Sequence, residues 1–213
     1  MEADTPPHPA TAPAAPAPEP GNQARGCVVE LAQTVIITAL LFLGIQGFVV
    51  QPFKVEQLSM QHSFESGDYV LVDKLTPRWD PYSRGDVVVF TPPADADRGT
   101  TPFIKRVIGL PGDTVEIVEG GLVAVNGATL DERYLFADAD GKPEPTSSNR
   151  EQRWVVPDGE LFVMGDHRGE SIDSRRFGTV EIGSVLGRAV LRYWPLREAG
   201  VVQVPGYEGV PAP

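Results

Sequence analysis

The most unusual chemical group in this sequence is a lysine inside an apolar stretch. In residues 103–108, FIKRVI, the alternation of a β-strand places Lys105 on the same face as Phe103 and Val107. Burial penalises the charged form of an amine, so a lysine forced onto such a face can act as a general base and activate a serine. The ordinary alternative is a lysine whose stem packs on the apolar face while its amine reaches solvent or an acid, and this segment alone does not decide between the two.

The three histidines offer a second way to activate a nucleophile. His8 lies near the N-terminus, His62 follows Ser59 by three residues, and His167 lies in the segment GDHR. Ser59, His167 and Asp173 could therefore form a serine protease triad. The histidines are dispersed in the sequence, and no two of them have the spacing that is typical of a metal site.

Composition narrows the classes of protein to consider. The chain of 213 residues has a formal net charge of -11, which argues against binding along nucleic-acid phosphates, so no nucleic-acid partner is expected. Its one cysteine, Cys27, precludes an intrachain disulfide and a cysteine-based zinc site. Apolar packing must therefore hold the folded part together, and a thiol mechanism is excluded.

The N-terminal part of the chain predicts a membrane anchor. Residues 1–26 are rich in proline and alanine and are expected to be a disordered tail. In the anchor, residues 27–50, the segment Leu31–Val50 carries no charge and is long enough to span a bilayer as a helix. A buried core helix is the alternative, and a cleavable secretory signal fits less well because no basic segment precedes the run. Flanking charges do not fix the orientation, because Arg25 and Lys54 are nearly symmetric about the span.

The rest of the chain predicts a mainly β domain over residues 51–196. Short runs rich in Val, Ile and Phe alternate with turn residues, and two hairpin turns are expected at Gly120–Gly121 and Asn126–Gly127. The pattern indicates a partly open antiparallel β-barrel or folded sheet with one N-terminal transmembrane helix. Residues 91–102 and 136–151 are expected to be loops or insertions, and residues 197–213 a flexible tail. The expected strands are Tyr69–Asp73, Asp86–Phe90, Phe103–Gly109, Thr114–Glu119, Leu122–Val125, Glu160–Met164 and Val185–Tyr193.

Four segments in this order carry a resemblance to a known family. They are Ser59–Met60, residues 84–90 (RGDVVVF), residues 105–113 (KRVIGLPGD) and residues 165–175 (GDHRGESIDSR). Over residues 30–196 the chain resembles bacterial type I signal peptidase. In that family a serine just beyond the anchor attacks the scissile carbonyl and a lysine is the general base. By position, the resemblance implies that Ser59 is the nucleophile and Lys105 the base.

The last motif implies supporting residues. Ser171 corresponds to the serine that orients the lysine by a hydrogen bond. Asp166, Asp173 and Arg175, together with Arg106, correspond to charged residues that shape the site, and we expect them to pair with one another. Structural ion pairing accounts for these four as well as a direct chemical role does.

Three positions depart from the family pattern. His62 stands where proline is typical, and His167 replaces an asparagine, which keeps the histidine triad open as an alternative. Some members carry, two residues before the nucleophile, a serine that helps to hold the oxyanion, and this chain has Gln57 there. Our hypothesis is that the Gln57 amide is the second oxyanion donor beside the main-chain N–H of Ser59.

The resemblance also implies partners and a location. The substrates would be exported preproteins cleaved after a small-x-small sequence, and the walls of the pockets would include Leu58, Met60 and the strand Tyr69–Val72. The chain would lie in the lipid bilayer of the bacterial cell membrane as a single-pass protein, with a cytoplasmic N-terminus and an extracytoplasmic catalytic domain. Contact with the secretion machinery is compatible with this location. Neither a metal ion nor an organic cofactor is implied.

Two other functions remain open at this point. Self-cleaving SOS repressors also use a serine and a lysine, but they lack a spanning segment such as Leu31–Val50. A membrane-anchored, non-catalytic β module that binds secreted proteins is the alternative from a different class. The joint presence of Ser59, Lys105 and the loop around Ser171 favours the peptidase.

Overall fold

The N-terminal part of the chain is one long helix. The computed structural model describes residues 20–96, 101–149 and 151–213. Helix α1 (Pro20–Phe48) contains a segment, Gly26–Phe48, that is long and apolar enough to cross a membrane and is not buried against other residues. The helix thus begins within the predicted tail, because Pro20 is tolerated at a first helical position and no proline follows until Pro52. The predicted tail before Pro20 lies outside the described residues.

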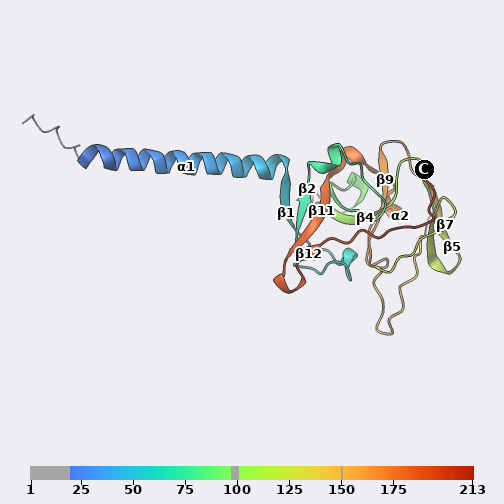
Figure 1. Cartoon of the computed structure of the whole chain (residues 1–213). Helices are drawn as coiled ribbons and strands as arrows, with labels where there is room; N and C mark the ends of the chain where they lie inside the picture. The colour runs from blue at the N-terminus through green and yellow to red at the C-terminus, as the bar shows by residue number, and fades with distance from the viewer. Residues whose placement is uncertain (1–19, 97–100, 150) are drawn as a thin grey trace, which may run out of the picture. The chain divides into compact units, whose positions relative to one another are not determined.

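The second unit, residues 44–213, is built on two antiparallel sheets. The larger has the strand order β1 (Val50–Lys54), β2 (Tyr69–Asp73), β11 (Val185–Trp194), β3 (Val87–Phe90), β4 (Phe103–Gly109), β9 (Glu160–Met164) and β10 (Val180–Glu181), and β12 (Gly200–Val201) pairs with β11. The smaller has the order β7 (Ala128–Thr129), β6 (Leu122–Val125), β5 (Thr114–Val118) and β8 (Arg153–Val155). The strand order of the larger sheet runs from β1 to β10 without closing, and Figure 1 shows it curling around β4. The predicted mainly β, partly open antiparallel fold is confirmed.

All seven predicted strands are present within one residue of the expected ends. Both hairpin turns adopt the left-handed backbone that their residues allow, with φ of 82° and 72° at Gly120 and Gly121, and 52° and 81° at Asn126 and Gly127. The strands that the pattern missed are β1, which contains Pro52, and the two- or three-residue strands β7, β8, β10 and β12. Such short strands offer too few residues for an alternation to be recognised.

Strand β4 is buried along its whole length because it lies between three apolar clusters. Ile104 packs in one cluster with Met60 and Phe64, while Phe103 faces a second. Ile108 belongs to the third cluster, which joins the two sheets. Every side chain of this strand, including its two cations, is therefore removed from bulk water.

The C-terminal segment also packs against the β unit. Residues 197–213 were expected to be a flexible tail, but the structure pairs β12 with β11 and places the Tyr207 hydroxyl 2.7 Å from that of Tyr134. Farther along, the Pro211 carbonyl accepts a hydrogen bond of 2.9 Å from Arg84. The segment, red in Figure 1, crosses the unit toward β5 and β7. Its proline- and glycine-rich composition carries no sign of these contacts.

Candidate active site

The structure brings Ser59 and Lys105 together. Ser59 lies in a short 3-10 helix, η1 (Leu58–Met60), and Lys105 extends from β4, so that Lys105 Nζ lies 2.7 Å from Ser59 Oγ. The amine also donates to the main-chain carbonyl of Ile104 at 3.0 Å and lies over the Phe103 ring, 4.9 Å from its centroid. Ser59 is 3% exposed and Lys105 1%. The amine and the hydroxyl are thus both buried and in direct contact.

Residues 58–64, which we call the Ser59 turn, are fixed by their own main chain and by two apolar side chains. Gln61 N donates to Leu58 O at 3.0 Å, and Phe64 N donates to Met60 O at 2.8 Å. Met60 and Phe64 are buried in the first apolar cluster. Ser59 therefore lies on a turn that is held by the core.

A cavity of about 300 Å³ opens beside Ser59 and Lys105. Of the residues expected in its wall, Leu58 is present, whereas Met60 is fully buried in the core and the strand Tyr69–Val72 does not line the cavity. Phe103 also lines the cavity and was not expected there, although alternation along β4 places it on the face of Lys105. Glu56, Glu170 and Ile172 line it as well, and the sequence carries no signal for them.

Gln57, the expected oxyanion donor, lies beside Ser59 and Lys105. Its side-chain Oε1 is 3.4 Å from Lys105 Nζ, and it lines the same cavity as Ser59. Gln57 is also the residue that precedes η1, so the N–H of Ser59 belongs to a first helical turn, whose N–H groups have no partner within the helix. The role of Gln57 as an oxyanion donor stays a prediction.

Ser171 is half-buried, and its hydroxyl oxygen is removed from solvent. Its hydroxyl makes no hydrogen bond of ordinary geometry to any described residue, although it helps to lower the pKa of the neighbouring Asp173 carboxyl. A Cβ at Gly165 would approach Ser171 Oγ to 2.3 Å and the Ser59 carbonyl to 2.5 Å, so only glycine fits there. Gly165 therefore lets the Ser171 loop approach the nucleophile. A hydrogen bond from Ser171 to Lys105 stays a prediction.

The four charged residues of the motifs form two ion pairs. Arg106 binds Asp166 with two hydrogen bonds of 2.9 and 2.7 Å, and both side chains are buried. Ser63 of the Ser59 turn joins this pair, since its hydroxyl donates to Asp166 at 2.5 Å. Burial alone would lower the pKa of Arg106, but the Asp166 carboxylate raises it above its usual range. The guanidinium is thus a permanent charge.

The second pair is between Asp173 and Arg175. Asp173 caps α2 (Ser174–Phe177), accepts from Arg175 at 2.7 and 2.8 Å, and accepts from the main-chain N–H of Gly165 at 3.0 Å. Burial raises the pKa of Asp173, but hydrogen bonds and charge from Arg175, with the Gly165 N–H, bring it below its ordinary value. Asp173 is thereby an ionised structural residue.

The histidine triad is not assembled. The His167 ring places Nδ1 3.1 Å from Gln61 Oε1, and stacks on Phe136 with 4.0 Å between ring centroids. Its link to Ser59 is through the main chain, because His167 N donates to the Ser59 carbonyl at 3.0 Å. Asp173 is held by Arg175 and Gly165. The nucleophile's hydroxyl faces the lysine instead.

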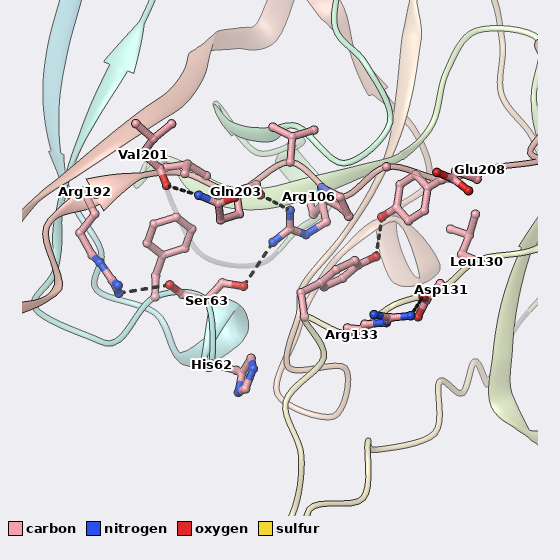
Figure 2. A pocket seen from close by; sticks show the side chains of 18 of the residues that line it. His62, Ser63, Arg106, Leu130, Asp131, Arg133, Arg192, Val201, Gln203 and Glu208 are labelled. Carbon is pink, nitrogen blue, oxygen red and sulfur yellow. Dashed lines mark hydrogen bonds and ion pairs between the residues drawn. The ribbon is translucent and has the colours of Figure 1, made fainter.

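A second cavity, of about 950 Å³, lies on the Arg106 side of the Ser59 turn. Figure 2 shows Ser63 and Arg106 joined by a hydrogen bond across it, with Arg192 bonded to the Ser63 main chain and His62 without a bonded partner in the view. Residues 200–208 of the C-terminal segment form much of its wall. The Ser59 turn therefore has one face toward the dyad and one toward this cavity.

Comparison with known proteins shows the family of the chain. Residues 28–194 match the family described as "Signal peptidase, peptidase S26". The chain belongs to the signal peptidase family. It is thus a serine endopeptidase, and the apolar helix α1 is compatible with membrane anchoring in this family.

Relatives cover most of the chain. A signal peptidase I of Leptolyngbya laminosa is 36% identical over 209 residues, which is 96% of this chain and 97% of the relative. Signal peptidase I S of Bacillus subtilis is 32% identical over 177 residues, 80% of this chain and 91% of the relative. A crystal structure of a signal peptidase I from Enterococcus faecalis aligns at 30% identity with a TM-score of 0.38, covering 51% of this chain and 97% of that chain. The assignment to the signal peptidase family rests on the family match and the sequence relatives.

Proposed function

We propose that the protein removes N-terminal signal peptides from exported preproteins, with Ser59 as nucleophile and Lys105 as general base. The observation that supports this most directly is the buried contact of 2.7 Å between Ser59 Oγ and Lys105 Nζ. A neutral amine at this distance can take the hydroxyl proton as Oγ attacks the scissile carbonyl. The resulting ammonium then protonates the leaving amine, and an ester to Ser59 remains. Lys105 deprotonates the water that hydrolyses this ester.

The oxyanion formed in each step needs hydrogen-bond donors. In this proposal they are the Ser59 N–H at the start of η1 and the Gln57 side-chain amide, which lies beside Ser59 and Lys105. In a cavity with little water such donors stabilise the transition state more strongly than they would in bulk solvent.

Two adjacent cavities suit a small-x-small sequence. The cavity at Ser59 shares Glu56 and Gln57 with a neighbouring cavity of about 220 Å³, whose wall includes Phe53 and Ile104. In an extended peptide, residues two apart point to the same side, so the side chains one and three positions before the cut would enter the two cavities. The preference for alanine and similarly small residues in this proposal rests on the family assignment, since cavities of about 300 and 220 Å³ also admit larger side chains.

The same proposal places the protein in the bacterial cell membrane. With α1 spanning the bilayer, the N-terminus would be cytoplasmic and the β unit extracytoplasmic, on the side where exported preproteins arrive. Anchoring enzyme and signal sequence in one membrane raises their encounter rate and holds the cleavage region near the surface. The lipid bilayer and, through the shared substrate, the secretion machinery would be partners.

The test is cleavage of a preprotein by the detergent-solubilised full chain. We expect Ser59→Ala and Lys105→Ala to abolish cleavage, and His167→Ala to retain it at a reduced rate. Lys142→Ala, which changes an exposed loop lysine, is the matched control and should cleave as the wild type does. Activity that survives Lys105→Ala but not His167→Ala would favour the triad, and no cleavage by the wild type would favour a binding module.

A further inference from the structure

The turn that contains His167 lies directly behind the nucleophile. His167 N donates to the Ser59 carbonyl at 3.0 Å, and two residues earlier Gly165 approaches the same carbonyl so closely that no side chain fits. The main chain of residues 165–167 thus fixes the carbonyl end of the nucleophile residue. The His167 side chain reaches farther along the Ser59 turn.

The His167 ring is held on three sides. Its Nδ1 lies 3.1 Å from Gln61 Oε1, two residues after Ser59, and its face stacks on Phe136 at an interplanar angle of 20°. Its Nε2 lies 3.8 Å from the Glu144 carboxylate, which is itself fixed by the Gly169 N–H at 2.8 Å. Only 12% of the His167 side chain is exposed. The ring therefore connects the Ser59 turn to the loop of residues 136–144.

We propose that His167 is a positioning residue that holds the Ser59 turn through Gln61 and so keeps Ser59 Oγ within reach of Lys105. The inference rests on the proposed function, and it assigns His167 no proton transfer. His167 does not line the cavity beside the nucleophile, so its removal leaves the substrate's contacts in place. Small displacements of a nucleophile reduce the rate of the chemical step far more than they reduce binding.

The experiment measures kcat and KM of the full-length protein in detergent with a signal-peptide substrate. His167→Ala should lower kcat by about ten- to a hundredfold and leave KM within about twofold. His167→Asn should restore kcat to within about threefold, because the asparagine Nδ2 donor can reach Gln61 in place of histidine Nδ1. His62→Ala is the matched control in the same turn and should behave as the wild type, since the His62 ring is exposed and has no hydrogen bond to a described residue.

Gln61, the residue that His167 contacts, provides a second, independent test. Gln61→Ala should reproduce the loss in kcat, and the double variant should be no slower than either single variant, because the two residues act through one contact. Gln61→Ala also decides the matter if His167→Ala does not fold, which its thermal unfolding curve would show.

Wild-type kcat in His167→Ala, or additive losses in the double variant, would overturn the positioning role. Equal impairment of His167→Ala and His167→Asn would also overturn it, because the donor to Gln61 would then be irrelevant. These outcomes leave the proposed function intact as long as Lys105→Ala is inactive. An active Lys105→Ala would overturn the proposed function itself.

Discussion

Two adjacent residues of β4 carry basic side chains with different roles, a proposed general base and a structural cation. Lys105 and Arg106 point to opposite faces and are 1% and 2% exposed. Lys105 meets the Ser59 hydroxyl, whereas Arg106 meets the Asp166 carboxylate in a two-fold hydrogen-bonded ion pair. An amine can lose its proton, but a guanidinium cannot do so in proteins. The residue type and its partner together thus distinguish Lys105, the proposed general base, from Arg106, the structural cation.

The Ser59 turn touches both faces. Ser59 meets Lys105 on one side, and four residues later Ser63 donates to Asp166 on the other. The structural pair therefore holds one end of the turn whose other end carries the nucleophile. Substitutions on the Lys105 face should therefore lower kcat, and substitutions on the Arg106 face should lower the free energy of unfolding.

The largest effect is expected from removing the amine. Lys105→Met keeps an unbranched side chain in the site and should lower kcat by about four orders of magnitude or more. The free energy of unfolding should not fall, because an apolar side chain replaces a buried amine. Peptide cleavage and urea unfolding of the same sample measure both. Lys105→Arg, which stays protonated, should be equally inactive. Turnover by either variant would contradict the assignment of Lys105 as the general base.

Breaking the ion pair on the other face should act mainly on stability. Asp166→Asn leaves the Arg106 charge buried without its counterion and should reduce the free energy of unfolding by about 3–5 kcal/mol. Replacing both partners, as in Arg106→Met with Asp166→Leu, should recover much of that loss. Urea unfolding measures both variants. If Asp166→Asn were as stable as the wild type but inactive, Asp166 would belong to the chemistry.

Substitutions of Gln57 test whether this residue stabilises the oxyanion while Lys105 transfers the proton. Gln57→Ala should lower turnover by about one to three orders of magnitude, since loss of one oxyanion donor costs up to about a thousandfold in kcat. Gln57→Glu has nearly the same shape but cannot donate, so it should be as slow. Initial cleavage rates at saturating substrate give the answer. An unchanged rate in Gln57→Ala would exclude Gln57 as an oxyanion donor.

Much of the fold could be predicted because its strands are long enough to show alternation. Strand β4 was placed at both ends, since its apolar run ends at Gly109 before a turn. Strand β1 escaped because it contains Pro52, which lies on an edge strand where a missing N–H is tolerated. The C-terminal segment escaped because its contacts, such as Tyr207 with Tyr134, join distant parts of the chain.

Part of the candidate active site could likewise be predicted from the sequence, and part could not. Ser59, Lys105 and ion pairing among the charged motif residues could be predicted from residue type and motif order, but which acid binds which arginine, as Asp166 binds Arg106, follows from the fold. His167 illustrates the limit best. Its residue type suggested a base, whereas its partner Gln61, 106 residues away, has no local signal in the sequence.

The second ion pair predicts a dependence of stability on pH. Because the folded-state pKa of Asp173 lies below its ordinary value of 3.8, the ionised pair stabilises the fold above that pH and loses this contribution as the pH falls below it. Asp173→Asn should therefore be less stable than the wild type at pH 7, and the gap should narrow on acidification below about pH 4. Urea unfolding between pH 3 and 7 measures this gap. A gap independent of pH would mean that Asp173 does not act as an ion.

The smallest effect is expected at His62, which lies in the Ser59 turn between Ser59 and Ser63. His62 has a φ of 85°, a left-handed conformation that non-glycine residues adopt at a cost of about 1–3 kcal/mol. His62→Gly should remove part of this strain, offset by the greater entropy of glycine in the unfolded chain, so we expect a gain in stability of about 1 kcal/mol or less with little change in kcat. Proline cannot adopt this φ, so His62→Pro should instead be destabilised and slow, because the direction of the chain between Ser59 and Ser63 would change. Thermal unfolding and kcat of both variants test this. A fully active, stable His62→Pro would show that the Ser59 turn does not need this conformation to reach both faces of β4.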